Sequence, residues 1–156
     1  MKWIFPFIVA ATSFWLDASS KAWAQRSLAE TTRELLSFLS LRLGFNSGIA
    51  FSWFASDEGA NRYVILVATS LLSLAIVCVM ATARIPTERV ALALILGGAL
   101  GNIADRIPDG YVTDFISVRL GEYHFPIFNL ADVCITIGAM LLFLALAPLR
   151  CVRHDG

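Results

Sequence analysis

Residues 63–83 read YVILVATSLLSLAIVCVMATA, 21 positions without one charged side chain. Such a run is long enough to cross a hydrocarbon core of about 30 Å as an α-helix. Three further apolar segments cover residues 3–23, 87–104 and 128–149. The composition agrees: 58% of the residues are hydrophobic and 15% are charged, whereas ordinary soluble domains carry about 25% charged residues. We therefore expect a mainly α membrane protein, one domain over residues 1–156, with four transmembrane helices.

The first apolar segment resembles a signal peptide at its start, after Lys2. It lacks a convincing small-residue cleavage site, and Asp17 and Lys21 lie towards its far end. We expect it to be retained as the first helix.

Four crossings place both termini on one side of the membrane. With cytoplasmic termini, seven of the twelve Lys and Arg residues lie outside, so the positive-inside count alone does not favour this orientation. The outer ones lie among ten acids, however, while the inner ones face only Glu88 and Asp155. The inner set is Lys2, Arg84, Arg89, Arg150 and Arg153. We expect both termini in the cytoplasm, and residues 24–62 and 107–124 outside it.

A short strand is predicted between the first two helices. Leu39, Leu41, Leu43 and Phe45 alternate with polar or small residues, which is the period of a strand with one apolar face. Residues 46–48 (NSG) supply turn chemistry before the apolar run 49–54. We expect a small extracytoplasmic sheet over about residues 36–54 and a short helix or loop over residues 56–61.

Two carboxylates at the membrane boundary are the strongest candidates for chemistry. Asp132 begins the fourth apolar segment, and Asp114 lies on the approach to it. A charge near hydrocarbon costs free energy unless it has a partner or a function. Two facing carboxylates would share a proton, so that one could take a proton from water while the other donates to a scissile carbonyl. Alone, Asp132 could instead favour a helix N-terminus, and Asp114 could be a solvated loop residue.

Two groups of polar residues have helical spacing. Asn102, Asp105 and Arg106 stand at i, i+3 and i+4, so they share one helix face. We favour a structural role for them, with Asp105 paired to Arg106 or to another charge. Asp17 and Lys21 stand at i and i+4, which indicates an intrahelical ion pair. Close helix approach is favoured by three glycines: Gly97, Gly98 and Gly101.

Other site chemistries find little support. The cysteines and histidines show no disulfide framework and no metal-ligand spacing, and the net charge of zero gives no reason to expect a nucleic-acid partner. A proton-coupled transporter with Asp105, Asp114 and Asp132 as a relay is the main alternative to hydrolysis. Against it, these acids gather at one membrane face, and no duplicated half is visible. A purely structural subunit is a third possibility.

Five motifs occur in order along the chain: DASSK (17–21), NSGIAF (46–51), GGALGNIADR (97–106), VTDF (112–115) and FNLAD (128–132). They resemble the successive signatures of bacterial lipoprotein signal peptidase, also called signal peptidase II. Each motif is weak alone, but five in order are specific. The tail after Leu149 matches no part of the pattern.

The resemblance implies an aspartyl endopeptidase of the bacterial inner membrane, with its active site at the extracytoplasmic face. It would cut prolipoproteins just before a lipobox cysteine that carries a thioether-linked diacylglycerol. It implies four transmembrane helices with a small extracytoplasmic sheet, membrane lipid as surroundings, a monomer, and no metal or organic cofactor. Asp114 and Asp132 would be the catalytic dyad. Substrate positioning and site support would fall to Asp17, Lys21, Asn46, Gly48, Asn102, Asp105, Arg106 and Asn129.

Overall fold

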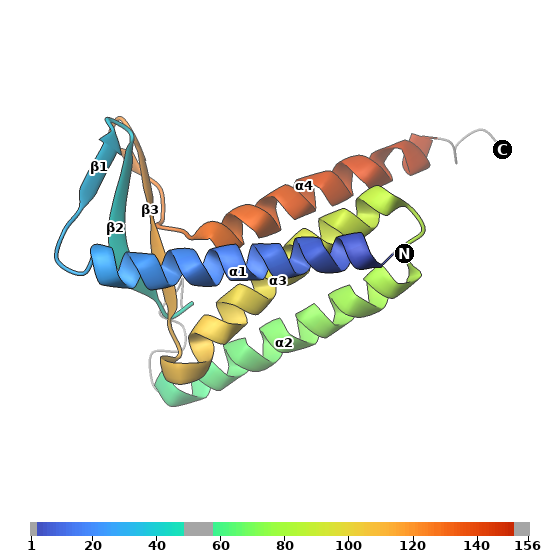
Figure 1. Cartoon of the computed structure of the whole chain (residues 1–156), viewed down its shortest axis with the longest axis horizontal. Helices are drawn as coiled ribbons and strands as arrows, with labels where there is room; N and C mark the ends of the chain where they lie inside the picture. The colour runs from blue at the N-terminus through green and yellow to red at the C-terminus, as the bar shows by residue number, and fades with distance from the viewer. Residues whose placement is uncertain (1–2, 49–57, 152–156) are drawn as a thin grey trace.

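A computed structural model of the chain describes residues 3–48 and 58–151 (Figure 1). These residues form four long helices and four strands, in the order α1-β1-β2-α2-α3-β3-β4-α4. The helices are α1 (Ile4–Ser27), α2 (Glu58–Thr82), α3 (Pro86–Asp109) and α4 (Leu130–Cys151). The strands are β1 (Arg33–Leu36), β2 (Leu39–Asn46), β3 (Val112–Leu120) and β4 (Tyr123–His124), and they form one antiparallel sheet in that order. The sheet stands at one end of the helix bundle, while the N-terminal end of α1 and the C-terminal end of α4 lie at the other (Figure 1).

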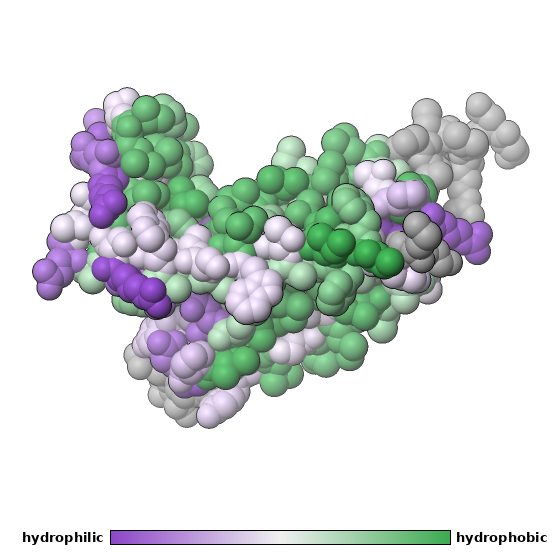
Figure 2. Space-filling view, in the orientation of Figure 1, coloured by the Kyte–Doolittle hydropathy of each residue, from purple (hydrophilic) through white to green (hydrophobic). Residues whose placement is uncertain are grey.

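The distribution of polarity is the reverse of that in a water-soluble domain. Large apolar side chains of the helices are exposed, among them Phe7, Leu71 and Phe143, whereas Asp17 and Lys21 are buried. Hydrophobic surface runs along the bundle, and hydrophilic residues gather at its two ends (Figure 2). A buried charge beneath an apolar exterior is typical of a helix bundle embedded in lipid.

Three helical segments are long and apolar enough to cross a membrane: Arg62–Thr82, Pro86–Asp109 and Leu130–Ala147. They overlap the predicted segments 63–83, 87–104 and 128–149. The first predicted segment also forms a helix, α1, but it does not meet the same standard of length and hydropathy over the part of the chain described. The fourth crossing therefore stays a prediction.

Helix α3 lies at the centre of the bundle because glycine lets its neighbours approach. A Cβ atom on Gly97 would lie 2.5 Å from the carbonyl oxygen of Ala10 on α1. A Cβ atom on Gly98 would lie 2.5 Å from the carbonyl oxygen of Ala131 on α4. No larger residue fits at either position without moving a helix backbone, so the expectation of close approach at these glycines is confirmed.

The sheet differs from the sequence expectation in its partners. The predicted strand forms as β2, but it pairs with β3, which lies between α3 and α4 in a segment where no strand was expected. Residues 49–57, including the apolar run and part of the expected helix or loop over 56–61, lie outside the described residues. Residues 58–61 belong to α2.

The apolar face of β2 is interrupted. Leu41 and Leu43 pack against a cluster formed by Ala24, Leu28 and Phe115, which ties the sheet to the end of α1. Phe45, expected on the same face, is 61% exposed. The register with β3 shifts between Leu41 and Gly44, so the strict alternation of faces is lost before Phe45 is reached.

The start of α4 is held beside β3. The N–H of Ile116 donates to the carbonyl of Phe128 at 2.8 Å, and the N–H of Phe128 donates back to Ile116 at 3.0 Å. This bridge brings Asn129, which follows directly, next to the strand that carries Asp114.

Candidate active site

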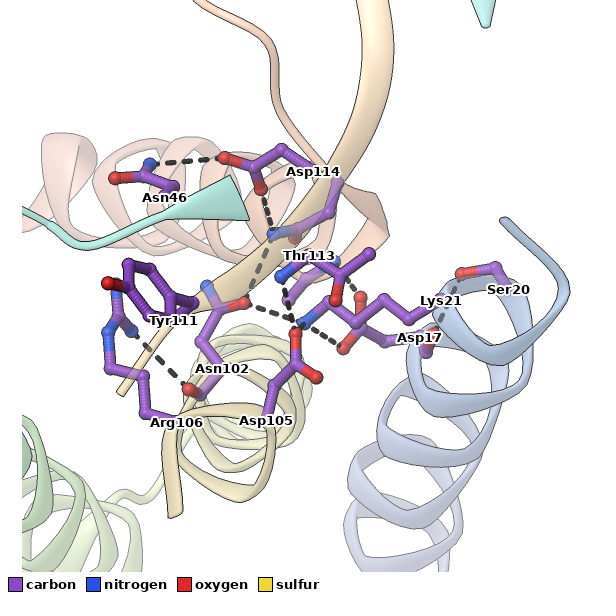
Figure 3. A network of polar contacts seen from close by, with 12 residues as sticks. Asp17, Ser20, Lys21, Asn46, Asn102, Asp105, Arg106, Tyr111, Thr113 and Asp114 are labelled. Atoms are coloured by element: carbon purple, nitrogen blue, oxygen red, sulfur yellow. Dashed lines mark hydrogen bonds and ion pairs between the residues drawn. The ribbon is translucent and has the colours of Figure 1, made fainter. Parts of the chain in front are cut away.

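The predicted polar residues converge where α1, α3 and α4 meet the sheet (Figure 3). Asp17 and Lys21 come from α1, and Asn102, Asp105 and Arg106 from α3 (Figure 3). The remaining members are Asn46 at the end of β2, Asp114 on β3, Asn129 just before α4, and Asp132 in its first turn. Hydrogen bonds and ion pairs link these residues to one another.

Asp114 is a buried carboxylate, 3% exposed, with both oxygens occupied. Asn46 donates through Nδ2 to Oδ2 at 3.1 Å, and Asn129 donates through Nδ2 to Oδ1 at 2.6 Å. Burial raises the pKa of Asp114, and the negative charge of Asp132 raises it further, while the two amide hydrogen bonds act in the opposite direction. Asp114 therefore holds a proton at a higher pH than an ordinary aspartate.

Asp132 and Asn129 cap α4 reciprocally. The N–H of Asp132 donates to Oδ1 of Asn129 at 3.0 Å, and the N–H of Asn129 donates to Oδ2 of Asp132 at 3.2 Å. This is the geometry of a capping box, with Asn and Asp in the two positions. The alternative of Asp132 as a helix N-terminal acid is thus realised. Only one of its oxygens serves the cap, however, and the other, Oδ1, accepts a hydrogen bond from Asn102 Nδ2 at 3.0 Å.

Two amides connect the two carboxylates. Asn129 Nδ2 donates to Asp114 Oδ1 and also to Asn102 Oδ1, the latter at 3.2 Å. Asn102 Nδ2 in turn donates to Asp132 Oδ1. Asp114 and Asp132 are therefore joined by a continuous chain of hydrogen bonds through Asn129 and Asn102. A pair of carboxylates held in this way is suited to acid–base chemistry on a bound water.

A buried ion cluster lies behind the amides. Lys21 Nζ is 2.7 Å from Asp17 Oδ2 and 3.6 Å from Asp105 Oδ2, so the predicted pair of Asp17 and Lys21 forms. Asp17 Oδ1 accepts the N–H of Ala131 at 2.8 Å, which links α1 to the first turn of α4. Asp105 Oδ2 accepts the N–H of Thr113 at 2.6 Å, which links α3 to β3.

Among the described residues, the ion-pair partner of Asp105 is Lys21 and not Arg106, so the alternative of another charge holds. Arg106 makes other contacts. Arg106 Nη1 donates to the main-chain carbonyl of Asn102 at 3.3 Å. Its buried Nε makes no hydrogen bond within the described residues. Arg106 lies beside Gly48, where an added Cβ atom would come within 3.3 Å of Nη2.

Gly48 fixes Asn46 in place. Its N–H donates to Asn46 Oδ1 at 2.7 Å, so that Nδ2 of the same amide points to Asp114. Gly48 has a φ of +78°, a conformation that favours glycine. The glycine of the NSG turn thus orients the amide that contacts Asp114.

Two residues beside the site, Gln25 and Thr113, were not predicted from the sequence. Gln25 Nε2 donates to Thr113 Oγ1 at 2.8 Å, and Thr113 directly precedes Asp114 in the chain. A signal was present: Gln25 follows Asp17 and Lys21 at steps of four, so all three share one face of α1.

Within residues 3–48 and 58–151, no three His, Cys, Asp or Glu side chains are grouped so as to hold a metal ion.

Comparisons with known proteins identify the family of this chain. Residues 9–147 match the family model described as signal peptidase (SPase) II. The lipoprotein signal peptidase of Cellvibrio japonicus is 41% identical over 88% of this chain and 83% of its own length. That of Sphingopyxis alaskensis is 42% identical over 88% of this chain and 82% of its own length.

A solved structure has the same fold. It is a bacterial membrane enzyme determined by the in meso method at 2.3 Å resolution, and it superposes with a TM-score of 0.81. The two share 26% sequence identity, and the match covers 97% of this chain and 93% of that one. The chain belongs to the signal peptidase II family, the membrane-embedded aspartic peptidases that remove signal peptides from prolipoproteins.

Proposed function

We propose that this enzyme cuts diacylglyceryl-modified prolipoproteins immediately before the lipobox cysteine, with Asp114 and Asp132 as its catalytic dyad. The observation that carries the proposal is the chain of hydrogen bonds from Asp114 through Asn129 and Asn102 to Asp132. It joins the two carboxylates at the end of the bundle where a membrane-bound peptide would leave the lipid.

The dyad divides the work of hydrolysis between an acid and a base. We assign the shared proton to Asp114, because burial and the charge of Asp132 favour its protonated form. Asp132 then takes a proton from water as the water oxygen adds to the scissile carbonyl carbon, and Asp114 donates its proton to the carbonyl oxygen. When the C–N bond breaks, the leaving amine takes the proton from Asp132, one hydroxyl of the tetrahedral intermediate returns a proton to Asp114, and the new carboxyl group keeps the water oxygen.

The other residues of the site hold the dyad or the substrate. Asn46 and Asn129 keep Asp114 in place through its two oxygens. Arg106 and Gly48 lie on the side of Asn46, where the substrate main chain would run, so we assign these three to substrate positioning. Asp17, Lys21 and Asp105 support the site from behind.

The site is proposed to face the extracytoplasmic side of the bacterial inner membrane, with α1 as the fourth crossing and both termini in the cytoplasm. The outward face of α1 supports this, since Phe7, Trp15 and Leu16 are exposed while Asp17 and Lys21 point inward. The short connection between α2 and α3, which carries Arg84, lies at the opposite end of the bundle from the sheet. We take the enzyme to act as a single domain and a monomer.

Lipid modification of the substrate should decide turnover. Burying an acyl chain against the apolar helix surface contributes about 0.8 kcal/mol per CH₂. A peptide bound by its signal helix alone could slide along the bundle, whereas the diacylglyceryl group would fix its depth and bring the bond before the cysteine to the dyad. Positioning of this kind lowers the barrier as well as strengthening binding.

The test uses the purified enzyme with a diacylglyceryl-modified lipobox peptide and its unmodified twin. Mass spectrometry should find cleavage before the modified cysteine only, with the twin almost inert at concentrations where both bind. Equal rates would contradict the proposal and indicate a more general intramembrane peptidase. Cleavage of neither peptide, together with proton flux through liposomes that contain the protein, would favour a transporter.

A further inference from the structure

Lys21 contacts Asn102, one of the two amides that link Asp114 to Asp132, and makes no hydrogen bond to either aspartate. Its Nζ donates to Asn102 Oδ1 at 2.8 Å, and the side chain is buried, with 4% of its surface exposed. Asn102 Oδ1 also accepts a hydrogen bond from Asn129 Nδ2. The oxygen of Asn102 thus receives two donors, one of them a cation (Figure 3).

The two ends of an asparagine amide differ, because the oxygen accepts hydrogen bonds and the NH₂ group donates them. With its oxygen towards Lys21, Asn102 presents its NH₂ to Asp132 Oδ1. Rotated by half a turn, the amide would present NH₂ to an ammonium group and oxygen to a carboxylate, and both contacts would be repulsive. The direction of the Asn129 amide is set by the cap of α4, because its oxygen accepts the N–H of Asp132. Its NH₂ therefore faces Asp114, and it finds a second acceptor in Asn102 only while the oxygen of Asn102 faces it.

We propose that Lys21 is a positioning residue that sets the direction of the Asn102 amide, so that Asn102 donates to Asp132 and accepts the hydrogen bond from Asn129. The inference rests on the proposed dyad. Arg106 cannot replace Lys21 in this role, since it contacts the main-chain carbonyl of Asn102 and not its amide. Asp17 and Asp105 hold the ammonium group in place from two helices.

The test neutralises Asp17 and Lys21 together, and Asp105, whose side chain is 19% exposed, keeps the hydrogen bond from the Thr113 N–H. In the double variant Asp17→Asn/Lys21→Met, the introduced amide oxygen can still accept the N–H of Ala131, and a buried ion pair replaced by neutral residues of similar size is often tolerated. We expect a folded protein with about wild-type thermal stability, a kcat lowered by about 100-fold and a KM changed by less than about threefold. Loss of folding, or a kcat within tenfold of wild type, would overturn the inference.

A double-mutant cycle shows whether Lys21 acts through Asn102. If it does, the double variant Asp17→Asn/Lys21→Met (the neutral pair) should lower kcat by less than about threefold when Asn102 is already alanine. A full 100-fold effect in the Asn102→Ala background would show that Lys21 acts by another route. Should Asp114→Asn and Asp132→Asn both remain active, the dyad itself would be wrong, and that failure is separate from this one.

The pH profile provides a readout that a purely structural role would not change. The Lys21 ammonium lowers the pKa of Asp114, against the effect of burial. The other charged groups around the dyad are Asp17 on α1, Asp105 and Arg106 on α3, and Asp132 on α4. In the neutral pair, the pKa of the proposed acid Asp114 should rise, and the basic limb of the kcat/KM profile should therefore move to higher pH. An unmoved limb would overturn the inference.

Discussion

Gly101 is the position where one added methyl group should cost most. A Cβ atom there would come into hard contact with Asp17 Oδ2 and would lie 3.2 Å from Asp17 Cγ. Asp17 is fully buried and cannot move aside freely, because Lys21 holds one of its oxygens and the N–H of Ala131 the other. Gly101→Ala must therefore displace Asp17 or push α1 away from α3.

The expected cost follows from these contacts. Overpacking costs about 1–3 kcal/mol, and losing a hydrogen bond to a charged group costs about 1.5–3 kcal/mol more. The better helix propensity of alanine returns about 1 kcal/mol. The free energy of unfolding should thus fall by about 1.5–5 kcal/mol. Cleavage should fall too, because Ala131 directly precedes Asp132 and depends on Asp17 for its place.

Unfolding in mixed micelles, followed by tryptophan fluorescence, measures this loss. The matched control is Gly44→Ala, where the added Cβ atom would lie 3.2 Å from the flexible end of Ile127 and 3.8 Å from a carbonyl oxygen of Asp114. That control should stay within about 1 kcal/mol of wild type. If Gly101→Ala also stays within about 0.5 kcal/mol, Asp17 does not hold α1, α3 and α4 together as described.

Three further predictions concern the site and the membrane. Asn46→Ala removes a hydrogen bond that favours ionised Asp114, so the pKa of this proposed acid should rise and the basic limb of kcat/KM should move to higher pH; an unmoved basic limb would mean that Asp114 does not govern it. In a cysteine-free background, an impermeant thiol reagent should label Ser37→Cys in intact cells but not Thr87→Cys, and the reverse pattern would invert the topology. Leu16→Arg places a charge on the outward face of α1 and should lower the amount of inserted protein, since arginine costs about 2.5–3.5 kcal/mol at mid-bilayer; unchanged insertion would argue against α1 as a crossing.

The helices could be predicted from the sequence because each contains a long, mainly apolar segment. The boundaries were less accurate: α3 continues to Asp109 although its apolar run ends near residue 104. Its last turn is stabilised by contacts from elsewhere in the chain, such as the Thr113 N–H on Asp105. Such distant partners leave no mark on local hydropathy.

The sheet was predicted only in part. The alternation of β2 was visible, but its partner β3 begins 66 residues after β2 ends, between two helices. The β-branched residues of β3, such as Val112, Ile116 and Val118, were a signal for a strand. The pairing itself depends on the bundle bringing the ends of α1 and α3 together, which one sequence does not show.

The residues of the site could be predicted better than their contacts. Spacing indicated the pair of Asp17 and Lys21 because one helix holds both. Spacing could not indicate that Lys21 reaches Asn102 across 81 positions of sequence. Contacts between helices set the direction of the Asn102 amide, and only the assembled bundle defines them.

Cleavage by two single variants tests the proposed dyad most directly. Asp114→Asn and Asp132→Asn should each fold and insert, because an amide fills the same space as the carboxylate. Each should lose at least about 100-fold in cleavage of a diacylglyceryl-modified lipobox peptide, since an amide cannot exchange the proton. The exposed Glu122 supplies the control, and Glu122→Gln should cleave at the wild-type rate. Turnover within tenfold of wild type by either folded aspartate variant would remove that residue from the chemistry.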